Sequence, residues 1–409
     1  MAMLRKLQQG GLLTGILVAP LLRRALAGDA AMRGAARAAA GLESAIVFVG
    51  SAQCDWDDST CRPGQPTTAQ ERIVYAVEVS ADGSLKPRPE LCVDVGGVPA
   101  WLTTAQVAGA NCLFVSRLDK DDILGLPLSS DSKPELPGSS APAGGQFPVF
   151  SAVAEGSTLL GANYGSKEGA SAVSYHIGSG CSLQLAQSIP HHGGSNVVRG
   201  RQADAHTHGV HPTEDGLAYA CDLGMDTVFV YKLLTDGQLQ EQGRVQTPAG
   251  CGPRHAVLHP GKSFVYVLCE LSQAVLTFQV SEQSPLLTLA QTSSFVPQGA
   301  SAGGSKAGEI VMLPDGSALY ASNRQGRNTI TGFAISKDNG LLTKAQEVPA
   351  PAFPRGMTLA LGGKLLLVAG QSKTQLVSYS VQPGGRLEAT GHSLTTGLPP
   401  FPAALAMMP

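Results

Sequence analysis

Residue types that bind anions and move protons recur between residues 201 and 355 of this 409-residue chain. Arginine forks onto carboxylate or phosphate groups, and histidine or glutamate transfers protons or activates water. Together they would serve an anionic, oxygen-rich small molecule. The predicted catalytic residues are Glu270, His206, His208, Arg254 and Arg324, and the predicted substrate-binding residues are Arg201, His255, Glu309 and Arg355.

The pair His206 and His208 raises the question of a metal site. Thr207 separates them, so on a strand both imidazoles point to the same side. No third ligand follows at a diagnostic spacing, and no Cys-x-x-Cys pair occurs. We therefore predict no metal and no cofactor, with a two-histidine metal site as the alternative. The remaining histidines of interest are interpreted as loop residues (His191 and His192) or structural residues (His211 and His259).

The eight cysteines carry information on the redox state. Cys112, Cys221 and Cys269 lie inside apolar, strand-like runs, where a free thiol behaves as a small hydrophobic group. Cys54 and Cys61 flank a loop and would pair in an oxidising compartment. The pattern predicts reduced thiols, with a Cys54–Cys61 disulfide as the alternative.

Seven apolar runs that end in a small or polar residue position these groups, and they recur along the chain. The aligned end positions are separated by 46 to 66 residues, and the residues are Ser51, Arg117, Asn163, Asp222, Cys269, Asn323 and Gly370. Repeats near this length with strand signals alone are typical of propeller blades. Turn pairs such as Asp315-Gly316 between apolar runs indicate hairpins. We predict an all-β, seven-bladed β-propeller with four-stranded blades; an array of β-sandwiches is the alternative.

The repeat allows equivalent positions to be compared. Eleven residues before Tyr219, Tyr266 and Tyr320 lie His208, His255 and Glu309, and four residues after them lie Leu223, Glu270 and Arg324. Arg355 matches Arg254, and Arg201 lies just before the histidines. Because first strands line the central channel of a propeller, we expect a polar mouth on one face of the channel. A channel that holds only structural water and ion pairs is the alternative interpretation of Glu309, and a structural or rim position is the alternative for Arg355.

The chain divides into two parts. Residues 1–41 are basic, rich in alanine and nearly free of acids, which is typical of an organelle transit peptide. This predicts a plastid or mitochondrial protein; a secretory signal or an uncleaved tail are the alternatives, with secreted or cytoplasmic locations. Residues 42–409 are predicted to form one propeller, in which residues 42–51 pair with the C-terminal unit to close the ring. Within it, residues 52–71 form an insertion and residues 127–146 a mobile loop.

Charge and hydropathy limit the partners. The formal charge is −2, and charged residues make up only 15% of the chain, which argues against nucleic-acid binding. No stretch reaches about 18 consecutive apolar residues, so no transmembrane helix is predicted. We expect a monomer that binds a small anionic molecule.

At this point the chain resembles a known family. The runs RQADAHTHGV, CGPRHAVLHP, FVYVLCELS and AGEIVMLPDGSALYASNR are similar to the lactonase-type seven-bladed propellers, which include 6-phosphogluconolactonases and carboxy-cis,cis-muconate cyclases. The likeness covers about residues 45–409 and is strongest from residue 155 onward. It implies an active site at the channel mouth on His206 or His208, Arg254, Glu270 and Arg324, with no metal. Three features depart from the family pattern: Ala205 replaces a proline, Cys269 replaces an asparagine, and a histidine is missing near Phe150.

The resemblance implies hydrolysis of a sugar lactone, 6-phosphogluconolactone first, as in the pentose phosphate pathway. In this hypothesis Glu270, helped by a histidine, activates water, while Arg254 and Arg324 hold the phosphate or the oxyanion. One alternative is a muconate-type cycloisomerase, in which the same groups transfer a proton. The other is a non-catalytic propeller that serves as a binding scaffold, because a fold alone implies no chemistry.

Overall fold

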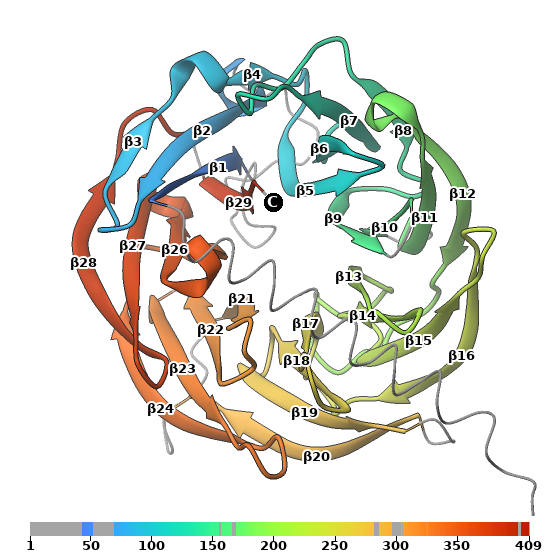
Figure 1. Ribbon diagram of the computed structural model, residues 1–409. Coiled ribbons are helices and arrows are strands. Elements are labelled where there is room, and N and C mark those ends of the chain that lie inside the picture. Colours follow the sequence, from blue (N-terminus) through green and yellow to red (C-terminus); the bar gives the residue numbers. More distant parts are fainter. Residues whose placement is uncertain are drawn as a thin grey trace, which may run out of the picture.

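A computed structural model of the chain shows a ring of seven antiparallel sheets around a central channel (Figure 1). The structure describes residues 43–51, 69–154, 157–165, 169–281, 286–296, 304, 306–324, 326–399 and 402–408. The predicted leader, residues 1–41, and the Cys54–Cys61 pair lie outside these residues. In the described part of the chain, helix is limited to short 3₁₀ turns at Ala69–Arg72, Pro89–Leu91, Ser179–Cys181, Leu361–Gly363 and Gln371–Lys373. The predicted all-β, seven-bladed fold is confirmed.

Each sheet runs outward from the strand beside the channel. The sheet that closes the ring contains β29 (Pro402–Met407), β1 (Ser44–Ser51), β2 (Ile73–Ser80) and β3 (Leu85–Pro87), with β4 (Val93–Asp94) also paired to β2. The second sheet contains β5 (Pro99–Val107), β6 (Ala110–Arg117), β7 (Asp122–Leu128) and β8 (Ser139–Pro142). The third contains β9 (Pro148–Ala154), β10 (Thr158–Asn163), β11 (Ser171–Ile177) and β12 (Leu183–Pro190).

Four sheets complete the ring with the same order. The fourth contains β13 (Thr207–Pro212), β14 (Leu217–Asp222), β15 (Thr227–Leu233) and β16 (Leu239–Gln246). The fifth contains β17 (Pro253–Leu258), β18 (Phe264–Cys269), β19 (Ala274–Val280) and β20 (Leu287–Ser294). The sixth contains β21 (Lys306–Met312), β22 (Ala318–Arg324), β23 (Thr329–Ile335) and β24 (Leu342–Pro349). The seventh contains β25 (Pro354–Ala360), β26 (Leu365–Gly370), β27 (Gln375–Gln382) and β28 (Arg386–Leu394).

Pairing between the two ends of the chain closes the ring. β1 pairs antiparallel with β29, with Val47 opposite Met407 and Val49 opposite Leu405. This confirms the predicted pairing of residues 42–51 with the C-terminal unit. β1 therefore has a strand partner on each side, β29 and β2. The prediction that residues 127–146 form a mobile loop is wrong for part of the segment. These residues include β8, the outer strand of the second sheet.

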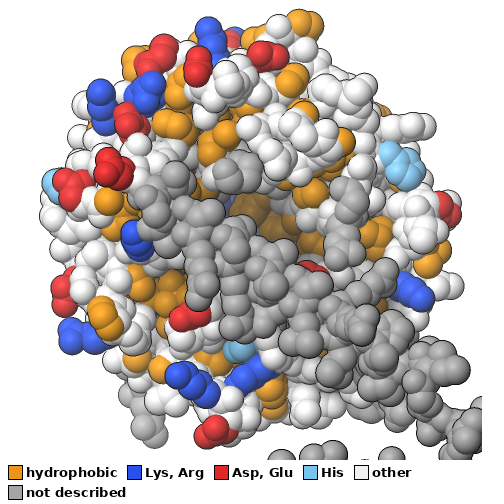
Figure 2. All heavy atoms as spheres, in the orientation of Figure 1, with side chains coloured by type: hydrophobic (Ala, Val, Ile, Leu, Met, Phe, Trp, Pro, Cys, Tyr) orange, Lys and Arg blue, Asp and Glu red, His pale blue; other side chains and the backbone are white. Residues whose placement is uncertain are grey.

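The core lies between neighbouring blades rather than in the channel. One cluster combines Tyr219 and Val230 of the fourth blade with Val267 and Phe278 of the fifth. Since apolar faces pack blade against blade, the channel remains available for polar side chains. On the face shown in Figure 2, acidic and basic side chains are interspersed along the outer rim. None of the described helical turns has the length or apolar character to span a bilayer.

A β-bulge lies at the start of each inner strand. In five of the seven inner strands a proline comes first, where its missing N–H costs no ladder hydrogen bond. The bulge follows at once, and bulges often re-aim a side chain beside a functional site. The bulge residues are Ala100, Val149, His208, Arg254, Arg355 and Ala403, with Gly308 and Glu309 in β21.

Two disulfides correct the prediction of reduced thiols. Cys112 pairs with Cys181 across the second and third blades, with Cα atoms 5.7 Å apart. Cys251 pairs with Cys269, with Cα atoms 4.8 Å apart. Cys112 and Cys269 do lie in apolar surroundings, as predicted, but each meets a cysteine from a distant loop that a linear pattern does not reveal. Cys221 is a buried free thiol, as predicted, and Cys92 is also free.

Candidate active site

Three arginines from separate segments converge on the carboxylate of Glu270. Arg201 Nη2 lies 2.7 Å from Oε1, while Arg254 Nε and Arg324 Nη2 lie 3.1 and 3.0 Å from Oε2. Arg201 comes from the β12–β13 connection, Arg254 from the bulge of β17, and Arg324 from the end of β22. We call Glu270 and these arginines the arginine cluster. The structure thus brings together the predicted residues Arg201, Arg254, Glu270 and Arg324.

The arginine cluster is largely buried around the Glu270 carboxylate. Glu270 is 1% exposed and Arg254 3% exposed. Burial alone would raise the pKa of Glu270, but the charges of Arg324, Arg201 and Arg254 outweigh it and hold that pKa well below its usual range. A carboxylate of such low basicity is a poor acceptor of a proton from water. The contacts with three guanidiniums therefore favour a charge-balancing role for Glu270, and the activation of water by Glu270 stays a prediction.

A second charged group lies next to the arginine cluster. His255 Nδ1 lies 2.6 Å from Glu309 Oε1, and both side chains are buried. Arg254 connects the two groups, because its Nη1 lies 3.1 Å from His255 while its Nε contacts Glu270. Ring contacts join His255 to His208, with centroids 5.0 Å apart, and to Trp101, 5.1 Å apart. Side chains from four inner strands therefore meet in one part of the channel.

The two histidines of the His-x-His motif both contact Tyr164. The His206 ring stacks on Tyr164 at 4.3 Å, and His208 meets it edge-on at 5.5 Å. The Tyr164 hydroxyl also accepts a hydrogen bond from Arg201 Nη2 at 3.3 Å. Burial lowers the pKa of His208 well below its usual range, and the positive charge of Arg254 lowers it further, so His208 is neutral near pH 7. Nδ1 of His208 is buried, and no described residue forms a hydrogen bond with it.

Tyr164 is a site residue that sequence reasoning missed. Asn163 ends the second strand of its blade, as Cys269 ends β18, so Tyr164 is the repeat equivalent of Glu270. The three tyrosines that mark the repeat lie in the fourth, fifth and sixth blades, so the equivalent position in the third blade was not predicted. The same position in the seventh blade is Gln371, whose Oε1 accepts a hydrogen bond from Arg355 Nη1 at 3.4 Å. Arg355 thus lies at the channel, on the side of the seventh blade.

The predicted alignment of the repeat units is wrong for His208. His211 faces Tyr219, eight residues on, whereas Val257 faces Tyr266, nine residues on. The β13–β14 turn is therefore one residue shorter, and the equivalent of His208 is Arg254 rather than His255. His255 and Glu309 do share a position, and Arg355 matches Arg254 as predicted.

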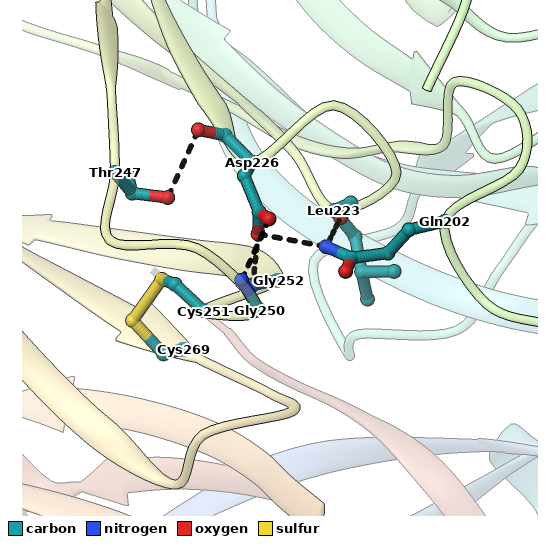
Figure 3. Close-up of a disulfide and its surroundings, with 8 residues drawn as sticks. All are labelled: Gln202, Leu223, Asp226, Thr247, Gly250, Cys251, Gly252 and Cys269. Atoms are coloured by element: carbon teal, nitrogen blue, oxygen red, sulfur yellow. Dashed lines mark hydrogen bonds between the residues drawn. A yellow bond between two sulfur atoms is a disulfide. The ribbon is translucent and has the colours of Figure 1, made fainter. Parts of the chain in front are cut away.

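The loop that carries Cys251 is held beside the arginine cluster by a buried aspartate (Figure 3). The Asp226 carboxylate accepts hydrogen bonds from the N–H groups of Gly250 and Gly252, both at 2.8 Å, and from Gln202 Nε2 at 2.7 Å. Gln202 adjoins Arg201, and Gly252 lies two residues before Arg254. The Cys251–Cys269 disulfide ties the same loop to the residue before Glu270. This network fixes the backbone under two arginines and their shared carboxylate.

Two histidines outside the arginine cluster have structural roles. His191 lies in a loop, as predicted, and its side chain is buried, with Nδ1 2.8 Å from Asp222 and Nε2 2.9 Å from Tyr231. Asp222 also accepts the His206 N–H, so this contact sets the start of β13. His211 is structural as predicted: its Nε2 accepts the Ala256 N–H at 3.0 Å. Among the described residues, no three His, Cys, Asp or Glu side chains gather as they would around a metal ion.

Comparison with known proteins places this geometry in a family. Residues 61–401 match the model of the seven-bladed β-propeller lactonases, so the chain belongs to this Lactonase family. A 6-phosphogluconolactonase from Cronobacter sakazakii is 31% identical over 211 residues, which span 51% of this chain and 62% of the relative. One from an Enterobacter species is 32% identical over 221 residues, spanning 53% of this chain and 65% of the relative. The matches thus span less than two thirds of these curated relatives.

Solved structures agree on the fold. The periplasmic gluconolactonase of Pseudomonas aeruginosa has a TM-score of 0.76 at 25% identity, over 90% of this chain and 99% of its own. A protein from Lactobacillus plantarum has a TM-score of 0.74 at 23% identity, over 90% of this chain and all of its own. These likenesses extend across nearly the whole propeller.

Proposed function

We propose that this protein hydrolyses a sugar lactone, with 6-phosphogluconolactone as the substrate and a place in the pentose phosphate pathway. The observation that carries the proposal is the convergence of Arg201, Arg254 and Arg324 on one carboxylate. Membership of the Lactonase family and the names of the curated relatives support it. Neither the cycloisomerase nor the scaffold alternative has comparable support.

The charge of the arginine cluster suits an anionic ester. Three guanidiniums face one carboxylate, which leaves an excess of two positive charges. A phosphate dianion, or the oxyanion that develops at the lactone carbonyl, would balance that excess. Glu270 reduces the repulsion among the three arginines before substrate arrives. In this scheme the arginines bind and stabilise negative charge, and a separate group accepts the proton of water.

The test is hydrolysis by the purified protein of freshly generated 6-phosphogluconolactone, with glucono-1,5-lactone in a parallel assay. We expect a rate above spontaneous hydrolysis for both, and a higher kcat/KM for the phosphorylated lactone. Added chelator should leave the rate unchanged. No rate above the spontaneous reaction would refute the proposal and favour the scaffold alternative.

We further propose that the protein folds in an oxidising compartment. Two buried disulfides support this, because such bonds persist mainly in secreted and periplasmic proteins. The proposal favours the secretory interpretation of residues 1–41 over the transit peptide. Tagging the full-length chain and locating it in its source cells would test it. Accumulation in a plastid or mitochondrion would refute it.

A further inference from the structure

We infer that His255, held by Glu309, is the general base that activates the hydrolytic water; this inference rests on the proposed lactone hydrolysis. Its first support is the orientation of the ring. His255 Nδ1 and Glu309 Oε1 are 2.6 Å apart, so the Nδ1–H donates a hydrogen bond to the carboxylate. The other ring nitrogen, Nε2, is then an acceptor, as a general base requires.

The contact of Arg254 leaves that acceptor available. Arg254 Nη1 lies 3.1 Å from both ring nitrogens of His255. If Nη1 lay in the plane of the ring at 3.1 Å from both nitrogens, it would clash with the ring carbon atoms. Nη1 must therefore lie above the face of the imidazole ring. The lone pair of Nε2 lies in the plane of the ring. Among the described residues, Nε2 has no other polar contact, so its in-plane lone pair has no protein donor.

The neighbouring His208 also has a ring nitrogen that needs a hydrogen-bond partner. Nδ1 of His208 is buried without a hydrogen bond from the described residues, and its ring centroid lies 5.0 Å from that of His255. Leaving a buried polar atom unsatisfied is unfavourable, so water or substrate belongs beside it. His208 and His255 therefore border one place where an oxygen-bearing molecule gains hydrogen bonds. Arg254 links this place to the arginine cluster.

The chemical step balances with these groups. Nε2 of His255 takes a proton from water while the water oxygen bonds to the lactone carbonyl carbon. The carbonyl π pair moves to its oxygen, next to Arg254. When the carbonyl re-forms, the bond to the ring oxygen breaks, and that oxygen takes the proton from Nε2 to become a hydroxyl. The product is a carboxylic acid, which releases its proton to solvent.

Four titratable residues besides Glu309 face His255 and set its pH dependence: Arg254, Glu270, His208 and His211. Burial lowers the pKa of His255 below its usual value, the Glu309 carboxylate raises it, and Arg254 lowers it again. His255 is therefore a free base at neutral pH. Activity should fall in acid, as His255 becomes protonated.

The test compares three variants of the full chain by kcat and by the pH profile of kcat/KM. His255→Asn keeps a donor toward Glu309 but deletes Nε2, and kcat should fall by about 10²–10⁴-fold, the range for a lost acid–base group. Glu309→Gln should lower kcat by about tenfold or more and shift the acid limb to lower pH, because the carboxylate that raises the His255 pKa is gone. His176→Gln, at an exposed position of β11 away from the inner strands, serves as the control with kcat near wild type.

The outcomes separate the two claims. A wild-type protein with no rate above spontaneous hydrolysis defeats the proposed function and, with it, this inference. An active wild type, a folded His255→Asn variant that keeps its kcat, and an unchanged acid limb in Glu309→Gln defeat the inference alone. If His255→Asn does not fold, the pH profile of kcat/KM for Glu309→Gln decides whether the inference holds. A glutamate with only a structural role would leave the acid limb of that profile unchanged.

Discussion

Replacing Glu270 with glutamine tests whether this residue balances charge or acts as a base. The substitution leaves three guanidiniums, two of them nearly fully buried, without their shared counter-ion. Removing one partner from a buried ion pair costs about 3–5 kcal/mol of unfolding free energy. With about 2.1 cal/mol/K of unfolding entropy per residue, the roughly 360 residues from Ser44 to Met407 give about 0.8 kcal/mol/K. Tm should therefore fall by about 4–6 °C.

The assay is thermal unfolding at several pH values together with steady-state kinetics. Because the folded pKa of Glu270 is depressed, its contribution to stability is full above the usual glutamate pKa of 4.5 and is lost as pH falls below it. The difference in Tm between wild type and Glu270→Gln should be largest near pH 7 and shrink below about pH 4.5. The turnover number should fall by no more than about tenfold, which is less than for a lost general base.

The matched control is Glu241→Gln. Glu241 forms an exposed ion pair with Arg244 at 2.9 Å, and exposed pairs contribute about 0–1 kcal/mol. Its Tm should stay within about 1 °C of wild type. A Glu270→Gln variant with unchanged Tm and turnover reduced by about 10²-fold or more would refute the charge-balance reasoning and restore Glu270 as the base.

Three further predictions follow from the same structure. Arg324→Gln should raise KM for 6-phosphogluconolactone more than for glucono-1,5-lactone if the guanidinium holds phosphate; equal effects on both in steady-state assays would contradict this. A chain that starts at residue 52 lacks β1, the partner of β29, and should melt well below one that starts at residue 43, whereas equal melting curves would refute closure by β1. Peptide mapping without reductant should recover the Cys112–Cys181 and Cys251–Cys269 links, and reduction should destabilise the fold by about 2–5 kcal/mol per bond, while free thiols at all four positions would refute both links.

The sequence predicted the propeller because its evidence is local and repeated. Apolar runs and hairpin turns recur in every unit. Six of the seven aligned end positions pair with the first residue of an inner strand, as Cys269 pairs with Pro253, and Asn323 pairs with the second residue of β21. The same repeat brought Arg254, Glu270 and Arg324 into one site. β8 was missed because its Pro- and Ser-rich sequence is typical of a loop.

What the sequence did not predict depends on contacts between distant residues. The pairing of Cys251 with Cys269 and the burial of His191 against Asp222 arise only when loops fold against strands. The role of Glu270 depends on how many cations surround it, which no spacing reveals. The predicted repeat position of His208 was wrong by one residue. The β13–β14 turn is one residue shorter than the β17–β18 turn, and the pattern of apolar residues does not reveal this difference.

The most direct test of the central claim is a crystal structure of the protein with 6-phosphogluconate, the product of the proposed reaction. We predict that the ligand lies at the channel mouth, with a phosphate or carboxylate oxygen at about 2.7–2.9 Å from at least two of Arg201, Arg254 and Arg324. A second ligand oxygen, or a bridging water, should contact Nε2 of His255. A ligand bound elsewhere on the propeller, with the three arginines still paired only to Glu270, would contradict the account.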